Sequence, residues 1–368
     1  MKTDIIIIGA GITGITLAER FASEGKNVLI IEKRNHIGGN CYDYYNEHGI
    51  LVHKYGPHIF HTNYEDVWNY LSNFTDWIYY QHKVLGNIDG KLVPIPFNLN
   101  TVYKLFPKKY AEKLEKKLIK QFGYGKRIPI LDLKNVDDED LKYLADFIYE
   151  KVFLNYTMKQ WGLKPEEIDK SVTARVPIVI SRDDRYFNDK YQGMPKEGYT
   201  KMFEKMLNNR NIKILLNTDY KEIIDWIDYD LMIYTGEIDY FFNYKYGKLP
   251  YRCLNFEFKT FDGDYQPVAV VNYNNNYDFT RITEFKKMTF QEHKKTTICM
   301  EYPSNVGVVA YPILNEENKR ILSKYMEEVN KLKDERIYFI GRLAGYKYYN
   351  MDETVKKALE LYYKLKGE

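Results

Sequence analysis

The pattern of apolar and polar positions predicts two buried strands joined by a helix at the start of the chain. Residues 5–8 form a continuous apolar run, which is typical of a strand buried on both faces. Helical spacing of apolar residues follows over 15–23, and a second apolar run covers 28–31. Because parallel strands need a long crossover, usually a helix, this pattern predicts a right-handed βαβ unit.

The rest of the chain changes from helical to strand-like patterning. From about residue 101 to 170 the spacing is helical and highly charged. Later apolar runs predict further strands and helices. Strands are expected at 175–180, 212–216, 231–234, 256–258, 268–273, 297–301 and 337–340, and helices at 199–207 and 352–365.

The turn between the first predicted strand and its helix carries three glycines in the spacing G-x-G-x-x-G. Gly9 permits the tight turn, Gly11 lets the backbone approach a pyrophosphate, and Gly14 lets the helix pack on the strand. Backbone amides and the helix dipole then hold the negative charge. Glu32 ends the next strand, where a carboxylate suits a ribose 2′-hydroxyl and repels a 2′-phosphate. These residues predict a dinucleotide site.

Two further features favour FAD over NAD. Gly38 and Gly39 give a second close backbone approach after Glu32, and the late strand at 337–340 runs into Gly341-Arg342 and a helix start. The positive end of such a helix stabilises negative charge on a reduced flavin. We therefore expect an α/β fold of three parts. These are a Rossmann-like FAD-binding domain (1–78, 199–235 and 330–368), an inserted helical-bundle domain (98–172) and a mixed or antiparallel β-sheet substrate domain (79–97, 173–198 and 236–329).

Charge and cysteine usage exclude several classes of protein. The net charge is only +3 and both signs are spread along the chain, so we expect no nucleic-acid partner. No apolar run is long enough for a membrane span or a secretory segment. Three isolated cysteines predict free thiols in a reducing compartment, hence a cytoplasmic protein. His58 and His61 have no third ligand at metal-binding spacing, so we expect no metal site.

Several longer motifs resemble the UDP-galactopyranose mutase family, in its flavin-dependent prokaryotic form. The matching stretches run through the chain in the family's order, at 32–40, 53–62, 156–162, 186–187, 191–195, 198–200, 234–236, 251–252, 280–284 and 341–343. This resemblance implies an isomerase of galactofuranose biosynthesis that interconverts UDP-galactopyranose and UDP-galactofuranose. It implies that N5 of reduced FAD attacks the anomeric carbon, without net redox change.

The resemblance also implies roles for individual residues. Arg175 and Arg281 match the two arginines that clamp the diphosphate, and with His61, near the flavin N5, they are the expected catalytic residues. Substrate contacts are expected from those arginines and from Phe153, Tyr156, Thr157, Trp161, Tyr186, Arg252, Asn272, Tyr311 and Tyr348. FAD contacts are expected from Gly9, Gly11, Thr13, Gly14, Glu32, Lys33, Gly39, Asn40, His58, Ile59, Arg342, Tyr349, Asn350 and Met351. A loop at 168–176 is expected to close over the substrate.

The expected partners are a UDP-sugar and an external reductant, such as NAD(P)H or a reductase, that maintains FADH₂. Family members are often dimers, so a homodimer is compatible with the resemblance. The chain departs from the family pattern at Asn350, where an acid is usual, and at Phe285, where histidine is common. These departures leave open a mutase for another UDP-hexose, such as UDP-N-acetylgalactosamine. An FAD-dependent oxidoreductase and a non-catalytic sugar-nucleotide binder remain further alternatives.

Overall fold

The computed structural model describes residues 2–162, 177–275, 277–332 and 334–367. The chain forms two compact units. Unit 1 comprises Met1–Tyr79, Asp189–Tyr251 and Ala310–Glu368, and unit 2 comprises Tyr80–Asn188 and Arg252–Val309. The division into three domains that we expect from the sequence stays a prediction.

Unit 1 is built on a parallel sheet of five strands in the order β12-β2-β1-β13-β19. Its centre is β1 (Lys2–Ile8), which pairs in parallel with both β2 (Val28–Ile31) and β13 (Asp228–Tyr234). The outer strands are β12 (Ile212–Leu215) and β19 (Ile337–Phe339). Ile5–Ile8 and all of β2 are buried, as expected for a sheet covered on both faces. The predicted Rossmann-like α/β fold is confirmed.

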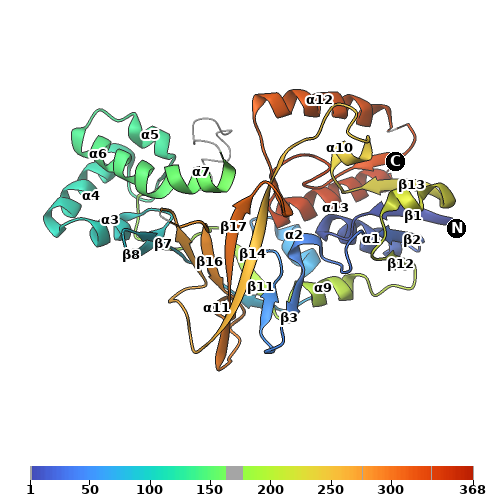
Figure 1. The fold of residues 1–368 in the computed structure, drawn as a ribbon, viewed down its shortest axis with the longest axis horizontal. Helices are drawn as coiled ribbons and strands as arrows, with labels where there is room; N and C mark the ends of the chain where they lie inside the picture. Colours follow the sequence, from blue (N-terminus) through green and yellow to red (C-terminus); the bar gives the residue numbers. More distant parts are fainter. Residues whose placement is uncertain (1, 163–176, 276, 333, 368) are drawn as a thin grey trace. The chain divides into compact units, whose positions relative to one another are not determined.

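Helices cover this sheet (Figure 1). Helix α1 (Ile12–Ser23) packs against α13 (Met351–Gly367) and α9 (Tyr199–Met206). The first turn of α1 starts three residues before the predicted range, because Gly11 is its N-cap and the glycine turn leads directly into the helix. The other helices of this unit are α2 (Glu65–Leu71), α10 (Ile238–Phe241) and α12 (Glu316–Lys331), with 3₁₀ turns at Gly39–Cys41, Tyr220–Glu222 and Ile224–Trp226.

Two smaller antiparallel sheets complete unit 1. One joins β5 (Phe60–Thr62), β11 (Tyr191–Pro195) and β6 (Trp77–Tyr79), with β11 in the middle. The other pairs β3 (Asp43–Tyr45) with β4 (Leu51–His53). Strand β5 also packs against α13, so these additions hold the histidine-containing turn before β5 close to the sheet's final helix.

Unit 2 contains a mixed sheet and a group of helices. The strands run in the order β18-β14-β17-β16-β15-β7-β8. Strands β15 and β7 are parallel, and the pairs β14–β17, β17–β16, β16–β15 and β7–β8 are antiparallel. Their bounds are β7 (Val84–Ile88), β8 (Lys91–Ile95), β14 (Tyr251–Asp262), β15 (Val270–Tyr273), β16 (Arg281–Glu284) and β17 (Lys295–Ser304), and β18 (Val308–Pro312) carries the chain back towards unit 1.

The helical part of unit 2 follows the charged segment that the sequence marks as helical. Its helices are α3 (Leu99–Leu105), α4 (Lys108–Phe122), α5 (Ile130–Lys134), α6 (Glu139–Ile148) and α7 (Asn155–Trp161), with α11 (Lys286–Thr289) between β16 and β17. A π-helical turn, Tyr149–Leu154, connects α6 to α7. The short strands β9 (Arg127–Ile128) and β10 (Ile178–Val179) pair with each other. Among the described residues no helix is both long and apolar enough to cross a bilayer.

Candidate functional site

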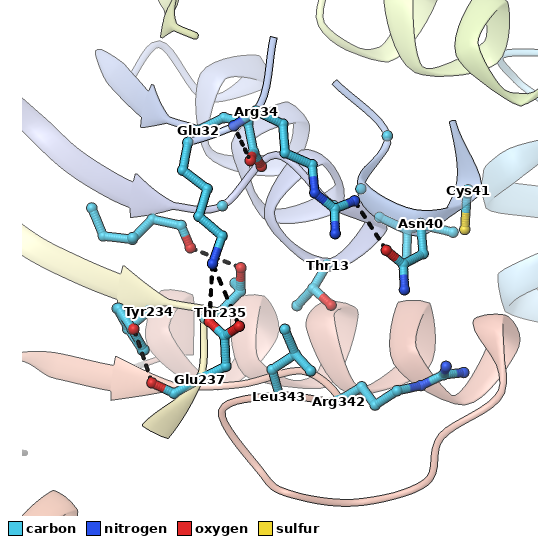
Figure 2. A pocket seen from close by; sticks show the side chains of 18 of the residues that line it. Thr13, Glu32, Arg34, Asn40, Cys41, Tyr234, Thr235, Glu237, Arg342 and Leu343 are labelled. Atoms are coloured by element: carbon cyan, nitrogen blue, oxygen red, sulfur yellow. Dashed lines mark hydrogen bonds and ion pairs between the residues drawn. The ribbon is translucent and has the colours of Figure 1, made fainter. Parts of the chain in front are cut away.

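A cavity lies in unit 1 at the carboxyl ends of β1, β2 and β13 (Figure 2). It holds about 1160 Å³ of space outside the protein atoms, counting the part open to solvent. Ligands of open parallel sheets bind at this edge, because the loops that follow the strands converge there.

The three glycines of the turn that lines the cavity have different roles: two are required by the fold, and one leaves space for a ligand. Gly9 has φ +104°, and a Cβ on Gly14 would lie 2.1 Å from the carbonyl oxygen of Gly9. Both positions therefore require glycine for the chain to fold. Gly11 has an ordinary φ of −77°, and a Cβ there would meet no atom within 4 Å. The space beside Gly11 is left open for a group that is not part of the chain, and a pyrophosphate fits it.

Glu32 is preorganised at the end of β2. It is buried, its Oε2 accepts the amide of Ala10 at 2.8 Å, and its Oε1 accepts the amide of Arg34 at 2.8 Å. These two bonds fix the carboxylate while each oxygen keeps a second lone pair for a ribose hydroxyl. Nearby, Arg34 donates from Nη1 to Asn40 Oδ1 at 3.0 Å, as Figure 2 shows.

The N-terminus of α13 closes the cavity. The side chain of Glu353 reaches back to the amide of Asn350 (2.8 Å), which is half of a capping box. Met351 lines the cavity, and its Sδ accepts the Cys41 thiol at 3.5 Å. Asn350 thus contributes to the start of the helix although it lacks the carboxylate that the family pattern has at this position.

Arg342 links this end of the cavity to a pair of stacked tyrosines. Its Nε and Nη2 donate to the carbonyl of Tyr349 at 3.2 and 2.5 Å, and its Nη1 donates to the carbonyl of Ala310 at 3.3 Å. Tyr311 and Tyr348 stack with ring centroids 5.2 Å apart, and the guanidinium lies 5.3 Å from the Tyr348 ring centre. Tyr311 and Tyr348, from which we expect substrate contacts, are therefore neighbours in unit 1.

The two histidines before and in β5 have different surroundings. Nδ1 of His58 lies 3.0 Å from the carbonyl oxygen of Gly56, and burial lowers the pKa of His58 to about 3. His58 lines the cavity and stays neutral at physiological pH. Nδ1 of His61 lies 3.0 Å from Oδ2 of Asp189.

Most predicted FAD contacts line the cavity, and some residues that line it were not predicted. Predicted residues in its lining are Gly9, Gly11, Thr13, Glu32, Lys33, Gly39, Asn40, His58, Arg342 and Met351, whereas Gly14, Ile59, Tyr349 and Asn350 are outside the lining. Additional residues come from segments after β12 and β13, including Asp219, Tyr220, Glu237 and Tyr240. Tyr240 donates to Asp219 Oδ2 at 2.6 Å, which ties the two segments together. These lining residues could have been predicted from the sequence, because the loops after adjacent parallel strands lie at the same edge of the sheet.

In unit 2, three polar residues stand in register across neighbouring strands. Asn272 on β15 pairs with Arg281 on β16, and Arg281 pairs with Glu301 on β17. Nε of Arg281 lies 3.5 Å from Oε2 of Glu301, and Nη2 donates to the hydroxyl of Tyr156 at 2.8 Å. Glu301 is buried, and burial raises its pKa while the charge of Arg281 lowers it. This row of Asn272, Arg281 and Glu301 holds a guanidinium in a defined place beside a tyrosine that is expected to contact the nucleotide.

Arg252 donates three hydrogen bonds to acceptors within unit 2, and its predicted contact with the substrate stays a prediction. It is buried on β14 and donates from Nε to the carbonyl of Gln160 (2.9 Å), from Nη2 to the carbonyl of Lys159 (2.7 Å), and from Nη1 to Asn305 Oδ1 (2.5 Å). Two of these acceptors are carbonyls at the C-terminal end of α7, where the helix dipole favours a cation. The geometry fits an anchor for α7 better than a direct ligand.

The placement of Tyr186 rests on two contacts with one neighbour. Its amide donates to the carbonyl oxygen of His82 at 2.8 Å, and the two rings meet edge to face with centroids 5.7 Å apart. Both residues belong to unit 2, so the backbone around Tyr186 is fixed within that unit.

Two further predicted substrate residues, Phe153 and Thr157, lie in α7 or just before it. Phe153 is buried in the π-helical turn and Thr157 is buried in α7. Arg175, the loop at 168–176 and the side chain of Trp161 are outside the described part of the chain. All of these site assignments stay predictions.

A family model and similar known proteins agree on one family for this chain. The family model described as UDP-galactopyranose mutase matches residues 151–348, and a model of NAD(P)-binding Rossmann-like domains matches residues 7–74. The chain is 38% identical to a probable UDP-galactopyranose mutase of Klebsiella pneumoniae, over 97% of this chain and 93% of that protein. It is also 38% identical to a dTDP-fucopyranose mutase of Escherichia coli, over 97% of this chain and 96% of that protein.

Further relatives agree with this result. A UDP-galactopyranose mutase of Mycoplasma genitalium is 37% identical, over 97% of this chain and 94% of that protein. A crystal structure of reduced UDP-galactopyranose mutase has the same fold, with a TM-score of 0.75 at 18% identity, covering 100% of this chain and 94% of that one. The chain belongs to the UDP-galactopyranose mutase family and is an FAD-dependent nucleotide-sugar pyranose/furanose mutase.

Proposed function

We propose that the protein interconverts UDP-galactopyranose and UDP-galactofuranose, with FAD in its reduced form and without net redox change. The observation that carries this proposal is the row of Asn272, Arg281 and Glu301, which directs one guanidinium towards Tyr156. A diphosphate leaving group requires such a fixed cation, because charge develops on it as the glycosidic bond breaks.

The residues of unit 1 support the cofactor part of the proposal. The open space beside Gly11 accepts a pyrophosphate, and Glu32 is held ready for a ribose hydroxyl. The N-terminus of α13 places its positive end at the cavity, where Met351 and Thr354 form part of the lining. Reduced FAD, when bound, supplies N5 as the nucleophile towards the anomeric carbon.

The residues of unit 2 support the substrate part. Arg281 neutralises the diphosphate and Glu301 fixes the orientation of that arginine from the neighbouring strand. Tyr156 and Thr157 lie on α7, which Arg252 anchors at its C-terminal end. We include Arg175 in the diphosphate site by resemblance, and we expect an external reductant such as NAD(P)H or a reductase. A homodimer is compatible with the resemblance.

A nucleotide sugar with a different hexose is the second candidate substrate. Asn350 replaces the usual acid at the start of α13, and the dTDP-fucopyranose mutase is as similar in sequence as the probable UDP-galactopyranose mutase of Klebsiella pneumoniae. The loss of a charge near the sugar is compatible with a different hexose.

One experiment compares three candidate substrates. The dithionite-reduced enzyme is given UDP-galactofuranose, dTDP-fucofuranose and UDP-N-acetylgalactofuranose in parallel, and the pyranose products are measured by chromatography. The proposal expects the highest kcat/KM with UDP-galactofuranose. A tenfold preference for either other sugar would replace the substrate that we propose.

A further inference from the structure

His61 belongs to a group of hydrogen-bonded side chains in unit 1 that also contains Asp189 and Asn63. It lies on β5, where it pairs with Gln192 of β11. Asp189, just before β11, places Oδ2 3.0 Å from His61 Nδ1 and accepts from Asn63 Nδ2 at Oδ1 (2.9 Å). The amide of Lys190 donates to Asn63 Oδ1 at 2.9 Å, so the amide group of Asn63 has a defined orientation.

This arrangement determines which ring nitrogen of His61 carries the proton. An ionised carboxylate only accepts hydrogen bonds, so Nδ1 must be the donor to Asp189. In the neutral ring the lone pair is then on Nε2. The side chains of His61 and Asp189 are only 13% and 22% exposed, so water competes weakly for this bond.

The neighbouring charges distinguish His61 from His58. Asp189 comes from the segment before β11, and Asp352 in the first turn of α13 also interacts electrostatically with His61. Asp352 is buried, and burial raises its pKa. His58 bonds instead to a backbone carbonyl. Of the two histidines, His61 is therefore the one whose tautomer a carboxylate controls.

We infer that Asp189 is a positioning residue that holds His61 in the Nδ1–H tautomer, so that Nε2 is the ring nitrogen that carries the lone pair in the working enzyme. This inference rests on the proposed function, because the role of His61 in the reaction comes from the resemblance to the mutase family. A carboxylate that fixes the tautomer of a working histidine has a large effect on catalysis in other enzymes.

The substitution Asp189→Asn gives a sharp test because Asn63 determines how the new amide is oriented. Asn63 Nδ2 requires an acceptor, so the oxygen of the new side chain stays towards Asn63. Its NH₂ group then faces His61 Nδ1 and donates to it, which moves the ring proton to Nε2. The double variant N63A/D189N frees the new amide to turn, so the original tautomer should return.

The tautomer is read from the ¹⁵N shifts of the His61 ring in the FAD-loaded full chain, assigned with His61→Gln. We expect Nδ1–H in the wild type, Nε2–H in Asp189→Asn, and a return towards Nδ1–H in the double variant. Turnover should fall at least tenfold in Asp189→Asn with FAD affinity unchanged, and recover in part in the double variant. Asp183→Asn, which alters an aspartate paired with Arg185 in unit 2, is the matched control and should change neither quantity.

Two results would overturn the inference. One is the same tautomer in the wild type and Asp189→Asn, and the other is a changed tautomer with wild-type turnover. If Asp189→Asn does not fold, Asn63→Ala alone serves, because a loosened Asp189 should weaken the tautomer preference. A wild type that turns over no nucleotide sugar would refute the proposed function, while the ring shifts would still decide whether Asp189 fixes the tautomer.

Discussion

Replacing Arg252 by methionine tests whether this arginine anchors α7 or contacts the substrate. The change keeps the volume of the side chain and removes all three hydrogen bonds from the guanidinium, two of them to the carbonyls of Lys159 and Gln160. Hydrogen bonds to charged groups contribute about 1.5–3 kcal/mol each. The desolvation of the buried guanidinium offsets part of this sum. We therefore expect a loss of about 3 kcal/mol in the free energy of unfolding.

Urea unfolding followed by circular dichroism measures this loss, and Asn305→Ala is the matched control. Asn305 accepts only one of the three bonds and is exposed, so its removal should cost about 1 kcal/mol. In the folded Arg252→Met enzyme, KM for the nucleotide sugar should rise about tenfold (about 1.4 kcal/mol) while kcat stays within about threefold of the wild type. Wild-type stability with a hundredfold loss of kcat would refute the anchor and favour direct contact with the diphosphate.

Three further predictions concern other parts of the molecule. The Gly11→Ala variant should fold with normal stability, because φ is −77° at this position and no atom lies within 4 Å of the new Cβ. It should bind FAD at least about tenfold more weakly, and unchanged affinity in a flavin titration would contradict the proposed pyrophosphate position. Arg281→Ala should reduce turnover on the order of a hundredfold or more while FAD stays bound, and activity above a tenth of wild type would show that Arg281 is not needed for the leaving group. Burial lowers the pKa values of His53 and His58 to about 3, below the usual 6.5, so between these pH values the unfolded chain binds more protons than the folded chain. The free energy of unfolding should therefore decrease as the pH is lowered, by about 2 kcal/mol per histidine from pH 7.5 to pH 5. Equal urea midpoints at the two pH values would contradict this.

Local sequence signals predicted the part of the fold that depends on neighbouring residues. The glycine turn and the two apolar runs determine a βαβ unit within a short stretch, and the structure has β1, α1 and β2 there. The end of β2 likewise placed Glu32 at the carboxyl edge of the sheet. In such a unit, turn chemistry and hydrophobic periodicity act over a few residues, so one sequence contains the necessary information.

Long-range register decides the rest of the candidate site. Asp189 is 128 positions from His61, and only the pairing of β5 with β11 brings them together. Arg252 meets the end of α7 across a separation of more than 90 positions, so its sequence motif could not distinguish an anchor from a ligand. The resemblance to a family located Arg281, but its alignment with Glu301 depends on strand pairing. Pairing of this kind depends on the packing of the whole unit.

In the proposed reaction, reduced flavin permits isomerisation of a nucleotide sugar without being consumed. The most direct test gives UDP-galactofuranose to the enzyme anaerobically, once with FAD reduced and once with FAD oxidised, while the flavin spectrum and the products are followed together. We expect many equivalents of UDP-galactopyranose per flavin with the reduced enzyme, an unchanged reduced spectrum, and no product with the oxidised enzyme. Product limited to one equivalent with matching flavin oxidation, or no product from fully reduced and loaded enzyme, would contradict this expectation.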